Sequence, residues 1–282
     1  MAMAADFKHE LIIPNEDLPF KLFLFEGKDG GYRREKHWHR SVEIFLILEG
    51  ELKFYINNVP LSLKARDFVI VNSNEIHSIE APEPNRTIVV QIPMNCFSDY
   101  VEKNDYAVFA RQEEAENRRL VLLIEEMYRI YQEKGFACEL KVRAMFYELL
   151  YFLITEFMTV EEDRGTIHQK RHLDKLSEIT EYIKKNYSRQ LTLIQVAGKF
   201  GFTPTYLSRM FSRYANVSYK TYLLNLRTEY GRREMLNSEA GLNEVALNNG
   251  FPNGRAFAKA FEKRYGCLPS EYRKQMKERS QK

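Results

Sequence analysis

The 282-residue chain is long enough for two domains with cores of their own. No apolar run approaches the ~20 residues that a membrane-spanning helix needs, and the N-terminus lacks the basic start and apolar stretch of a secretory signal. The three cysteines lie far apart without a CxxC pair, which favours free thiols in a reducing compartment. We therefore expect a cytoplasmic protein that has no membrane partner.

The charge is divided unevenly along the chain. Residues 1–170 carry 21 Lys and Arg against 29 Asp and Glu, a net of −8, whereas residues 171–282 carry 21 against 10, a net of +11. Such asymmetry indicates that the C-terminal part meets a polyanion and the N-terminal part does not. Charge alone leaves a membrane surface or an acidic protein open as the partner.

The chain begins with a β-rich region between residues 20 and 92. Short runs of β-branched and aromatic residues alternate there with turn sequences such as Asn57-Asn58 and Asn72-Ser73-Asn74. The runs are 21–25, 42–48, 52–56, 68–71 and 87–92. Strands this close together predict a small sandwich or barrel.

A helical hairpin is predicted next, over 117–133 and 139–158, because apolar residues recur there at helical spacing. The hairpin could simply cover the β-rich region. Two apolar stripes are more than a cover needs, so we expect a dimer interface that includes Leu120, Leu123 and Met127. The polar stretch that follows has no periodicity and is predicted to be a linker.

The basic part contains an internal repeat. Residues 193–202 align with residues 242–251 at an offset of 49, and Asn216 aligns with Gly266 after one extra residue in the second copy. Each copy predicts a short helix with an interior Val-Ala, a Gly-Phe turn and a second amphipathic helix. Glycine tolerates the left-handed conformation of a sharp turn, so each copy is typical of a helix-turn-helix unit.

The second helix of the first copy has Thr203 as its N-cap and Pro204 at its first position. Its exposed face is expected to carry short polar and basic side chains, which suit a helix in the major groove. These are Thr205, Ser208, Arg209, Ser212 and Arg213, with Arg255, Ala258, Lys259, Glu262 and Lys263 in the second copy.

Residues 191–274 resemble the double helix-turn-helix domain of the AraC/XylS family, and residues 261–273 are similar to its signature. The resemblance implies that bases are read by Thr205, Ser208, Arg209, Arg255, Ala256 and Lys259. Pro252 departs from the family pattern, in which a Ser-like N-cap is usual. We expect Asn253 to cap the helix instead, so that the helix starts one residue late. Gly231 interrupts the helix predicted between the two copies.

A histidine cluster lies in the acidic part. His37 and His39 share one face of an extended segment, and alternation places Glu43, Phe45 and Ile47 on one face of the next strand. This arrangement, followed by His77, resembles the cupin barrel. The first cupin motif is complete, whereas the second is met only at its histidine.

Three interpretations of the cluster remain open. The first is a pocket for a small effector, formed by His37, His39, Glu43, Phe45 and His77. The second is a hydrogen-bonded structural cluster. The third is a divalent metal bound by the three histidines and the glutamate, as in cupin enzymes. We favour the effector pocket and expect no cofactor.

The sequence therefore predicts an α+β protein of two domains. The expected parts are a cupin-like barrel (1–110), a helical hairpin for dimerisation (111–160), a linker (161–171) and an all-α DNA-binding domain (172–282). Full-length AraC-type regulators share this order. The resemblance implies a homodimeric activator of carbohydrate genes, controlled by a sugar and acting on promoter DNA with RNA polymerase. The alternative is a metal-dependent cupin enzyme fused to a DNA-binding domain.

Overall fold

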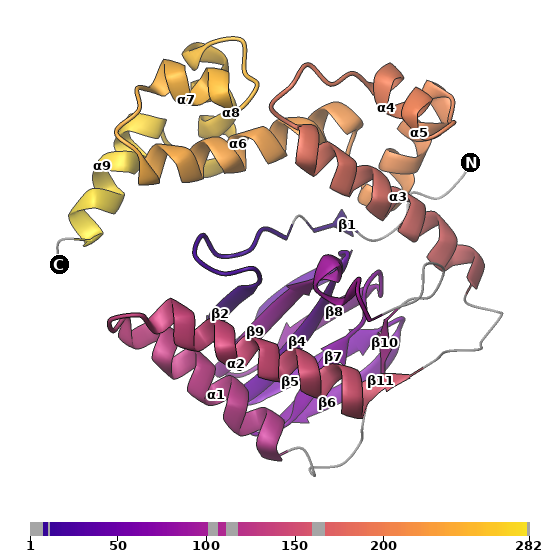
Figure 1. Ribbon diagram of the computed structural model, residues 1–282, viewed down its shortest axis with the longest axis vertical. Coiled ribbons are helices and arrows are strands. Elements are labelled where there is room, and N and C mark those ends of the chain that lie inside the picture. The colour runs from indigo at the N-terminus through magenta and orange to yellow at the C-terminus, as the bar shows by residue number, and fades with distance from the viewer. Residues whose placement is uncertain (1–7, 11, 101–106, 111–117, 160–166, 281–282) are drawn as a thin grey trace. The chain divides into compact units, whose positions relative to one another are not determined.

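The computed structural model describes residues 8–10, 12–100, 107–110, 118–159 and 167–280 (Figure 1). The chain divides into two compact units, Asp6–Asp174 and Lys175–Lys282. Among the described residues, no helix combines the length and the apolar character needed to cross a membrane.

The first unit contains two β-sheets. One sheet has the order β1 (Lys8–His9), β3 (Tyr32–Trp38), β8 (His77–Ala81), β5 (Glu51–Ile56) and β6 (Val59–Lys64). The other has the order β2 (Lys21–Gly27), β9 (Asn85–Pro93), β4 (Ser41–Glu49) and β7 (Phe68–Val71). Every pairing in these sheets is antiparallel except that of β1 with β3. The β-rich domain predicted from the sequence is confirmed.

The two sheets pack face to face and form a sandwich rather than the closed barrel that we expected. Within the described residues, no hydrogen-bonded strand pair joins one sheet to the other. Strand β4 shows how the layers form, because its side chains alternate between two cores. Phe45 and Ile47 point between the sheets, whereas Ile44 and Leu46 point to the opposite face. The alternation predicted for this strand is confirmed.

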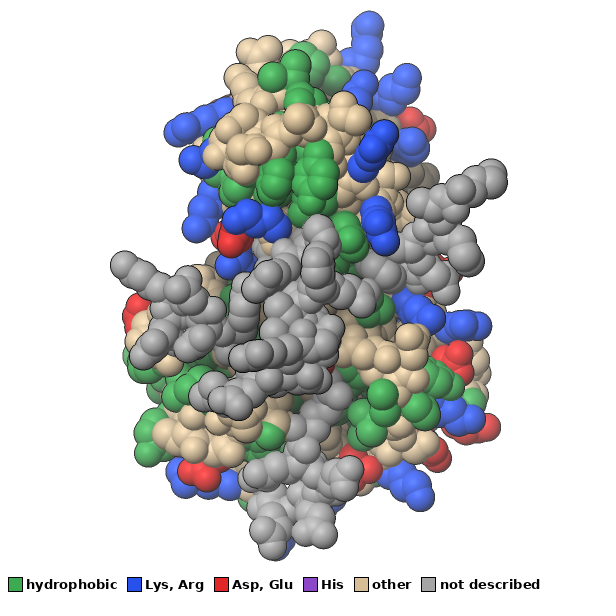
Figure 2. Space-filling view, turned by 90° about the vertical axis from the view of Figure 1, so that its right-hand side faces the viewer, with side chains coloured by type: hydrophobic (Ala, Val, Ile, Leu, Met, Phe, Trp, Pro, Cys, Tyr) green, Lys and Arg blue, Asp and Glu red, His purple; other side chains and the backbone are tan. Residues whose placement is uncertain are grey.

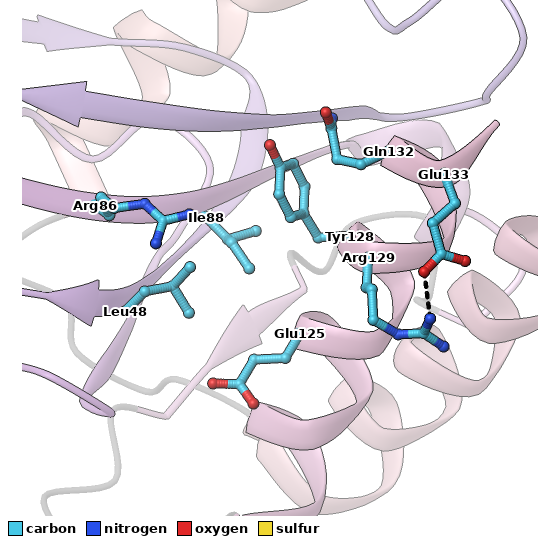
Figure 3. A pocket seen from close by; sticks show the side chains of 8 residues that line it. All are labelled: Leu48, Arg86, Ile88, Glu125, Tyr128, Arg129, Gln132 and Glu133. Carbon is cyan, nitrogen blue, oxygen red and sulfur yellow. Dashed lines mark hydrogen bonds and ion pairs between the residues drawn. The ribbon is translucent and has the colours of Figure 1, made fainter.

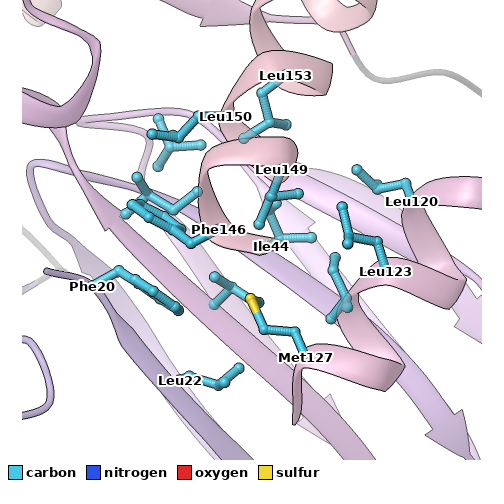
Figure 4. Packing of buried hydrophobic residues seen from close by; sticks show 14 of the residues in the cluster. Phe20, Leu22, Ile44, Leu120, Leu123, Met127, Phe146, Leu149, Leu150 and Leu153 are labelled. Carbon is cyan, nitrogen blue, oxygen red and sulfur yellow. The ribbon is translucent and has the colours of Figure 1, made fainter. Parts of the chain in front are cut away.

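Helices α1 (Arg118–Glu133) and α2 (Cys138–Phe152) cover the outer face of the β2-β9-β4-β7 sheet. Leu120, Leu123 and Met127 are buried there beside Ile44 and Phe146 (Figure 4). The prediction that these three residues form a dimer interface is therefore wrong. The apolar face of β4 needs a cover, and α1 supplies it from the same chain.

Short elements complete the first unit. A 3-10 turn, Met94–Phe97, follows β9, and a π-helical turn, Leu153–Phe157, continues α2. Strands β10 (Val108–Phe109) and β11 (Met158–Thr159) then pair in an antiparallel ribbon.

The second unit is helical. Its helices are the part of α3 (Ile167–Asn186) from Lys175 onward, α4 (Leu193–Lys199), α5 (Pro204–Met210) with a π-helical turn at Phe211–Ala215, α6 (Tyr219–Asn237), α7 (Leu242–Asn248), α8 (Gly254–Tyr265) and α9 (Pro269–Ser280). Helix α3 begins within the linker predicted at 161–171. The run Gln169-Lys170-Arg171 consists of good helix formers, which explains the earlier start. Residues 161–166 lie outside the described residues.

The internal repeat has the same structure in both copies. Helices α4 and α7 span seven residues each and bury the paired Val-Ala at their centres. Gly201 and Gly250 follow them with φ angles of +70° and +76°, where a side chain would be strained. The second helices end at Asn216 and Gly266, which are both left-handed. Two helix-turn-helix units are therefore present, as the repeat predicted.

Candidate functional site

The first candidate for a DNA-recognition helix, called here a reading helix, is α5, which continues through Phe211–Ala215. The Thr203 hydroxyl accepts a hydrogen bond from the backbone N–H of Tyr206 at 3.2 Å, and Pro204 occupies the first turn. The predicted cap is therefore confirmed. A buried stripe on this helix holds it against the unit. The opposite face exposes Thr205, Ser208, Arg209, Ser212 and Arg213.

The second candidate reading helix, α8, starts one residue late, as predicted. Asn253 Oδ1 accepts a hydrogen bond from the backbone N–H of Ala256 at 2.9 Å, and the helix begins at Gly254. Arg255 and Lys259 are exposed. Ala256, which we expected to read bases, is half-buried and packs against the core around Phe257. Only part of its methyl group is therefore exposed for contact with a base.

The exposed basic side chains on these helices are available to DNA. Within the described part of the chain, neither Arg209 nor Lys259 takes part in an ion pair. Figure 2 shows Lys and Arg side chains projecting from the second unit, with few Asp or Glu side chains among them on the face in view. Such a surface attracts the phosphate backbone, and its short polar groups suit base edges.

Helix α6 connects the two helix-turn-helix units. At its centre, Arg227 donates hydrogen bonds from Nε to the Tyr187 carbonyl and from Nη2 to the Arg189 carbonyl, both at 2.8 Å. One turn of α8 is held by Glu229, whose carboxylate accepts a hydrogen bond from the Tyr265 hydroxyl. Phe211, directly after α5, also packs against Tyr219 and Tyr222 of α6, so this helix contacts both helix-turn-helix units.

The predicted histidine cluster also exists, inside the first unit. His37 and His77 are cross-strand neighbours in β3 and β8, and His39 follows β3 directly. Glu43 reaches the same point from β4 in the other sheet. Each of the four residues is at most 6% exposed, and one ligand atom from each lies within 4.8 Å of the others. The two sheets therefore bring together Glu43 and His77, which are 34 positions apart in the sequence.

Hydrogen bonds fix the orientation of the three imidazole rings. Nδ1 of His37, His39 and His77 lies 2.9, 3.1 and 3.1 Å from the backbone carbonyls of Glu35, Ser41 and Glu75. A carbonyl oxygen only accepts, so each Nδ1 carries a proton and donates it. Every Nε2 then faces a carboxylate.

The Glu43 carboxylate is the centre of the cluster. Its Oε2 lies 2.7 Å from His39 Nε2 and 3.2 Å from His77 Nε2, and its Oε1 accepts a hydrogen bond from Gln91 Nε2 at 2.7 Å. Burial alone would raise the pKa of Glu43, but His39 and His77 hold that pKa well below its ordinary value. The carboxyl is therefore an anion inside the protein.

Two members of this site were missed in the sequence. Gln91 is the single polar residue within the apolar run 88–92, which was a usable signal of a buried polar contact. Glu10 lies 3.0 Å from His37 Nε2 and 2.7 Å from Arg34. Burial would raise the pKa of Glu10, but His37 and Arg34 lower it to about 2. Nothing in the pattern around residue 10 indicated this contact.

Aromatic residues near the cluster belong to the core. The Phe45 ring packs edge-on against Phe54, with ring centroids 4.7 Å apart, and both lie in the layer between the sheets. Trp38 is fully buried and contacts the His9 ring. Phe45 therefore bounds the cluster on its apolar side, 6.4 Å from the His77 ring.

A pocket of about 490 Å³ lies elsewhere, between β4, β9 and α1. It is lined by Leu48, Arg86, Ile88, Glu125, Tyr128, Arg129, Gln132 and Glu133 (Figure 3). Both of its guanidinium groups are already engaged, because Arg86 pairs with Glu49 and Arg129 pairs with Glu133. The pocket therefore offers an apolar floor but no unpaired cation for an acidic ligand.

Comparison with known proteins identifies a family model for each of the two parts of the chain. Residues 19–150 match the family model described as an AraC-like ligand binding domain, and residues 196–275 match that of a helix-turn-helix domain. The chain belongs to the AraC family of transcriptional regulators. The two matches fall on the β-sandwich with its helical hairpin and on the repeated helices of this AraC-type regulator.

Curated relatives match this chain along most of its length. The chain is 25% identical to the Msm operon regulatory protein of Streptococcus mutans over 95% of this chain and 96% of the relative. It is 20% identical to an uncharacterized HTH-type transcriptional regulator of Staphylococcus aureus (strain COL), over 83% of this chain but 31% of that longer protein.

The solved structures of ToxT from Vibrio cholerae have the same fold. One, with an unsaturated fatty acid bound, is 18% identical, covers 93% of this chain and 97% of its own, and has a TM-score of 0.50. Another, from strain O395, is 15% identical over 90% of this chain and 97% of its own, with a TM-score of 0.51. At this identity the likeness concerns the fold alone.

Proposed function

We propose that this AraC-type regulator recognises promoter DNA in the cytoplasm through α5 and α8, with Arg209 and Lys259 as its principal basic contacts. The observation that carries the proposal is the repeated geometry. Two equivalent helices, held by one connecting helix, each expose basic and small side chains in the part of the chain with a net charge of +11. Two helices of one protein that enter successive major grooves must lie about 34 Å apart.

The DNA contact is tested with an operator selected from a random duplex library by the full-length protein. Arg209→Ala is expected to weaken binding to the selected duplex by about 1–3 kcal/mol while leaving binding to an unrelated duplex nearly unchanged. Arg33→Ala, which removes an exposed arginine of the first unit, is the matched control. Equal weakening on both duplexes would make Arg209 a phosphate contact and contradict its role as a base reader.

The second part of the proposal concerns the effector. Buried polar groups of the ligand-binding domain gather in one cluster, which joins the two sheets and consists of His37, His39, Glu43 and His77. We assign ligand sensing to it, with a change in promoter occupancy and in contact with RNA polymerase as the output. The family resemblance favours a sugar and activation of carbohydrate genes. The fatty acid bound to ToxT makes a fatty acid the second candidate.

The effector is identified by thermal unfolding of the full chain in the presence of monosaccharides, disaccharides and long-chain fatty acids. A ligand of the site raises the unfolding temperature of the wild type and changes its affinity for the selected operator. Glu43→Gln is expected to remove both responses. A response that survives Glu43→Gln would move the effector site away from the cluster.

The third part replaces the dimer interface that the structure contradicts. The outer face of α2 exposes Leu140, Tyr147 and Tyr151, at 71%, 67% and 65%. Together with Ala144, these residues follow one another at intervals of four, three and four positions. This is the spacing of the residues that form the interface, or seam, of a coiled coil. Arg143 and Glu148 flank the seam but already bond to Asp17 and Arg119 of the same chain, so the complementarity to a second copy of α2 rests on the apolar side chains. We therefore propose that two copies associate through this face.

A further inference from the structure

A side-chain contact joins the two copies of the helix-turn-helix repeat, in addition to α6. Helix α3 ends at Asn186, and the loop 187–191 leads from it toward α4 of the first copy. From this loop the Tyr187 hydroxyl donates a hydrogen bond to Asn249 Oδ1 at 3.2 Å. Asn249 lies in the turn between α7 and α8. The loop that precedes the first copy therefore contacts the turn of the second copy, and this contact is called the Tyr187–Asn249 bridge.

The loop is held in place on α6. Tyr219, in the first turn of α6, donates a hydrogen bond from its hydroxyl to the Leu191 carbonyl at 2.9 Å, and Arg227 binds two further carbonyls of the loop. The Tyr187 ring stacks on that of Tyr230, with ring centroids 4.4 Å apart. Burial raises the pKa of Tyr187 to about 12, so its hydroxyl keeps the proton that it donates at neutral pH. The loop thus presents a fixed donor to the second copy.

The acceptor in the second copy is buried and fully engaged. Asn249 is only 1% exposed. Its amide nitrogen donates to Glu234 Oε2 at 2.5 Å and to the Val245 carbonyl at 2.8 Å, while its amide oxygen accepts from Tyr187. A shift of one copy against the other would break the bridge and leave a buried amide oxygen without a donor, which is costly. The network therefore favours one arrangement of the two copies.

Comparison of the two copies shows that a helix-turn-helix unit does not need this bridge. Phe200 stands in the first copy where Asn249 stands in the second, and it makes a ring contact with α3 instead. A Cβ atom at Gly201 would meet nothing within 4 Å, whereas one at Gly250 would lie 2.7 Å from the Ser188 carbonyl oxygen. The close polar approach is a feature of the second copy, so it serves the contact between the copies rather than the fold of either.

We infer that the Tyr187–Asn249 bridge sets the distance between the two DNA contact regions that the protein accepts in an operator. The inference deepens the proposed function and rests on it, because this distance matters only if α5 and α8 bind the same duplex. One inserted base pair moves the second contact region by about 3.4 Å and turns it by about 35° around the DNA axis. A bridge that resists movement of the copies makes such a duplex a poor ligand. Tyr187 is thus a positioning residue, which acts on DNA through the helices that it orients.

The test compares the selected operator with two duplexes that carry one base pair more or one base pair less between the contact regions. Anisotropy titrations with the full-length protein give the ratio of the affinities for the selected and the altered duplexes. We expect the wild type to prefer the selected duplex at least about 10-fold. Tyr187→Phe removes only the hydroxyl and should reduce this preference to about 3-fold or less. Tyr182→Phe makes the same substitution in α3, on the ring that contacts the first copy, and should keep the wild-type preference.

Each ratio is measured within one protein, so a loss of folded molecules in a variant does not change it. The inference is overturned if Tyr187→Phe keeps the wild-type preference, or if Tyr182→Phe loses as much of it. A wild type that binds all three duplexes equally also overturns it. The footprint of the wild type on the selected operator then decides about the proposed function, because two contact regions support that function and a single region contradicts it.

Discussion

Gly231 of α6 lies directly against the ring of Phe257 in α8. A Cβ atom at position 231 would come within 2.7 Å of Phe257 Cε2, which is closer than two carbon atoms can approach. The sequence presented this glycine as an interruption of the connecting helix. The structure shows that it permits the close approach by which α6 carries the second helix-turn-helix unit.

Gly231→Ala should therefore destabilise the protein although alanine is the better helix former. Overpacking against Phe257 costs about 1–3 kcal/mol, more than the ~1 kcal/mol that the helix gains. The matched control is Gly198→Ala in the exposed part of α4, where a Cβ meets nothing within 4 Å. Thermal unfolding should show a lower midpoint for the first variant and an unchanged or higher one for the second. The reverse order would contradict the packing described here.

The Glu229 network should make the stability of the second unit depend on pH. Burial would raise the pKa of Glu229, but hydrogen bonds from Arg232 and Tyr265 and the nearby guanidinium groups lower it. A group whose pKa is lowered by folding stabilises the protein above its ordinary pKa, and this contribution is lost as the pH falls through the folded value. Glu229→Gln should thus lower the unfolding temperature near neutral pH and lower it less in acid. If the unfolding temperature of Glu229→Gln lies below that of the wild type by the same amount at every pH, the charge of Glu229 is not the cause.

The two reading helices should differ in their contribution. Helix α8 begins at Gly254 and half-buries Ala256, so it offers fewer groups to base edges than α5 does. We expect Lys259→Ala to weaken binding to the selected duplex and to an unrelated duplex equally. The salt dependence of binding should fall by about one released counterion. Anisotropy titrations at several salt concentrations measure both effects. Selective loss on the chosen operator would instead make Lys259 a base reader.

The outer face of α2 should control the oligomeric state. Tyr147→Glu puts a charge in the middle of the proposed seam and should shift the protein to monomers in light scattering, without loss of helix content. Gln132→Glu, which changes a residue of α1, is the control. Leu123→Asp and Met127→Asp should unfold the first unit instead, because those residues lie in its core. A Tyr147→Glu protein that stays dimeric would place the interface elsewhere.

Much of this architecture could be predicted from local signals. The offset of 49 between the repeats, the Gly-Phe turns and the Thr203-Pro204 cap each specify a conformation by themselves, so the two helix-turn-helix units followed from the sequence. The same holds for β4, where alternation alone assigned Glu43 and Phe45 to one face.

Long-range packing could not be predicted in this way. The stripe of Leu120, Leu123 and Met127 is the same in a helix that covers a sheet and in one that meets a second subunit, and only the structure distinguishes them. Glu10 joins the histidine site through a parallel pairing of β1 with β3, which no local pattern indicates. The contact of Gly231 with Phe257 likewise depends on how α6 and α8 cross.

The central claim is that α5 and α8 bind one DNA molecule together, and a hydroxyl-radical footprint with base-methylation interference on the selected operator tests it most directly. The account predicts two major-groove contact regions per chain, about one helical turn apart on one face of the duplex, with loss of the α5 region in Arg209→Ala. A single contact region in the wild type, or two regions that persist unchanged in Arg209→Ala, would contradict it.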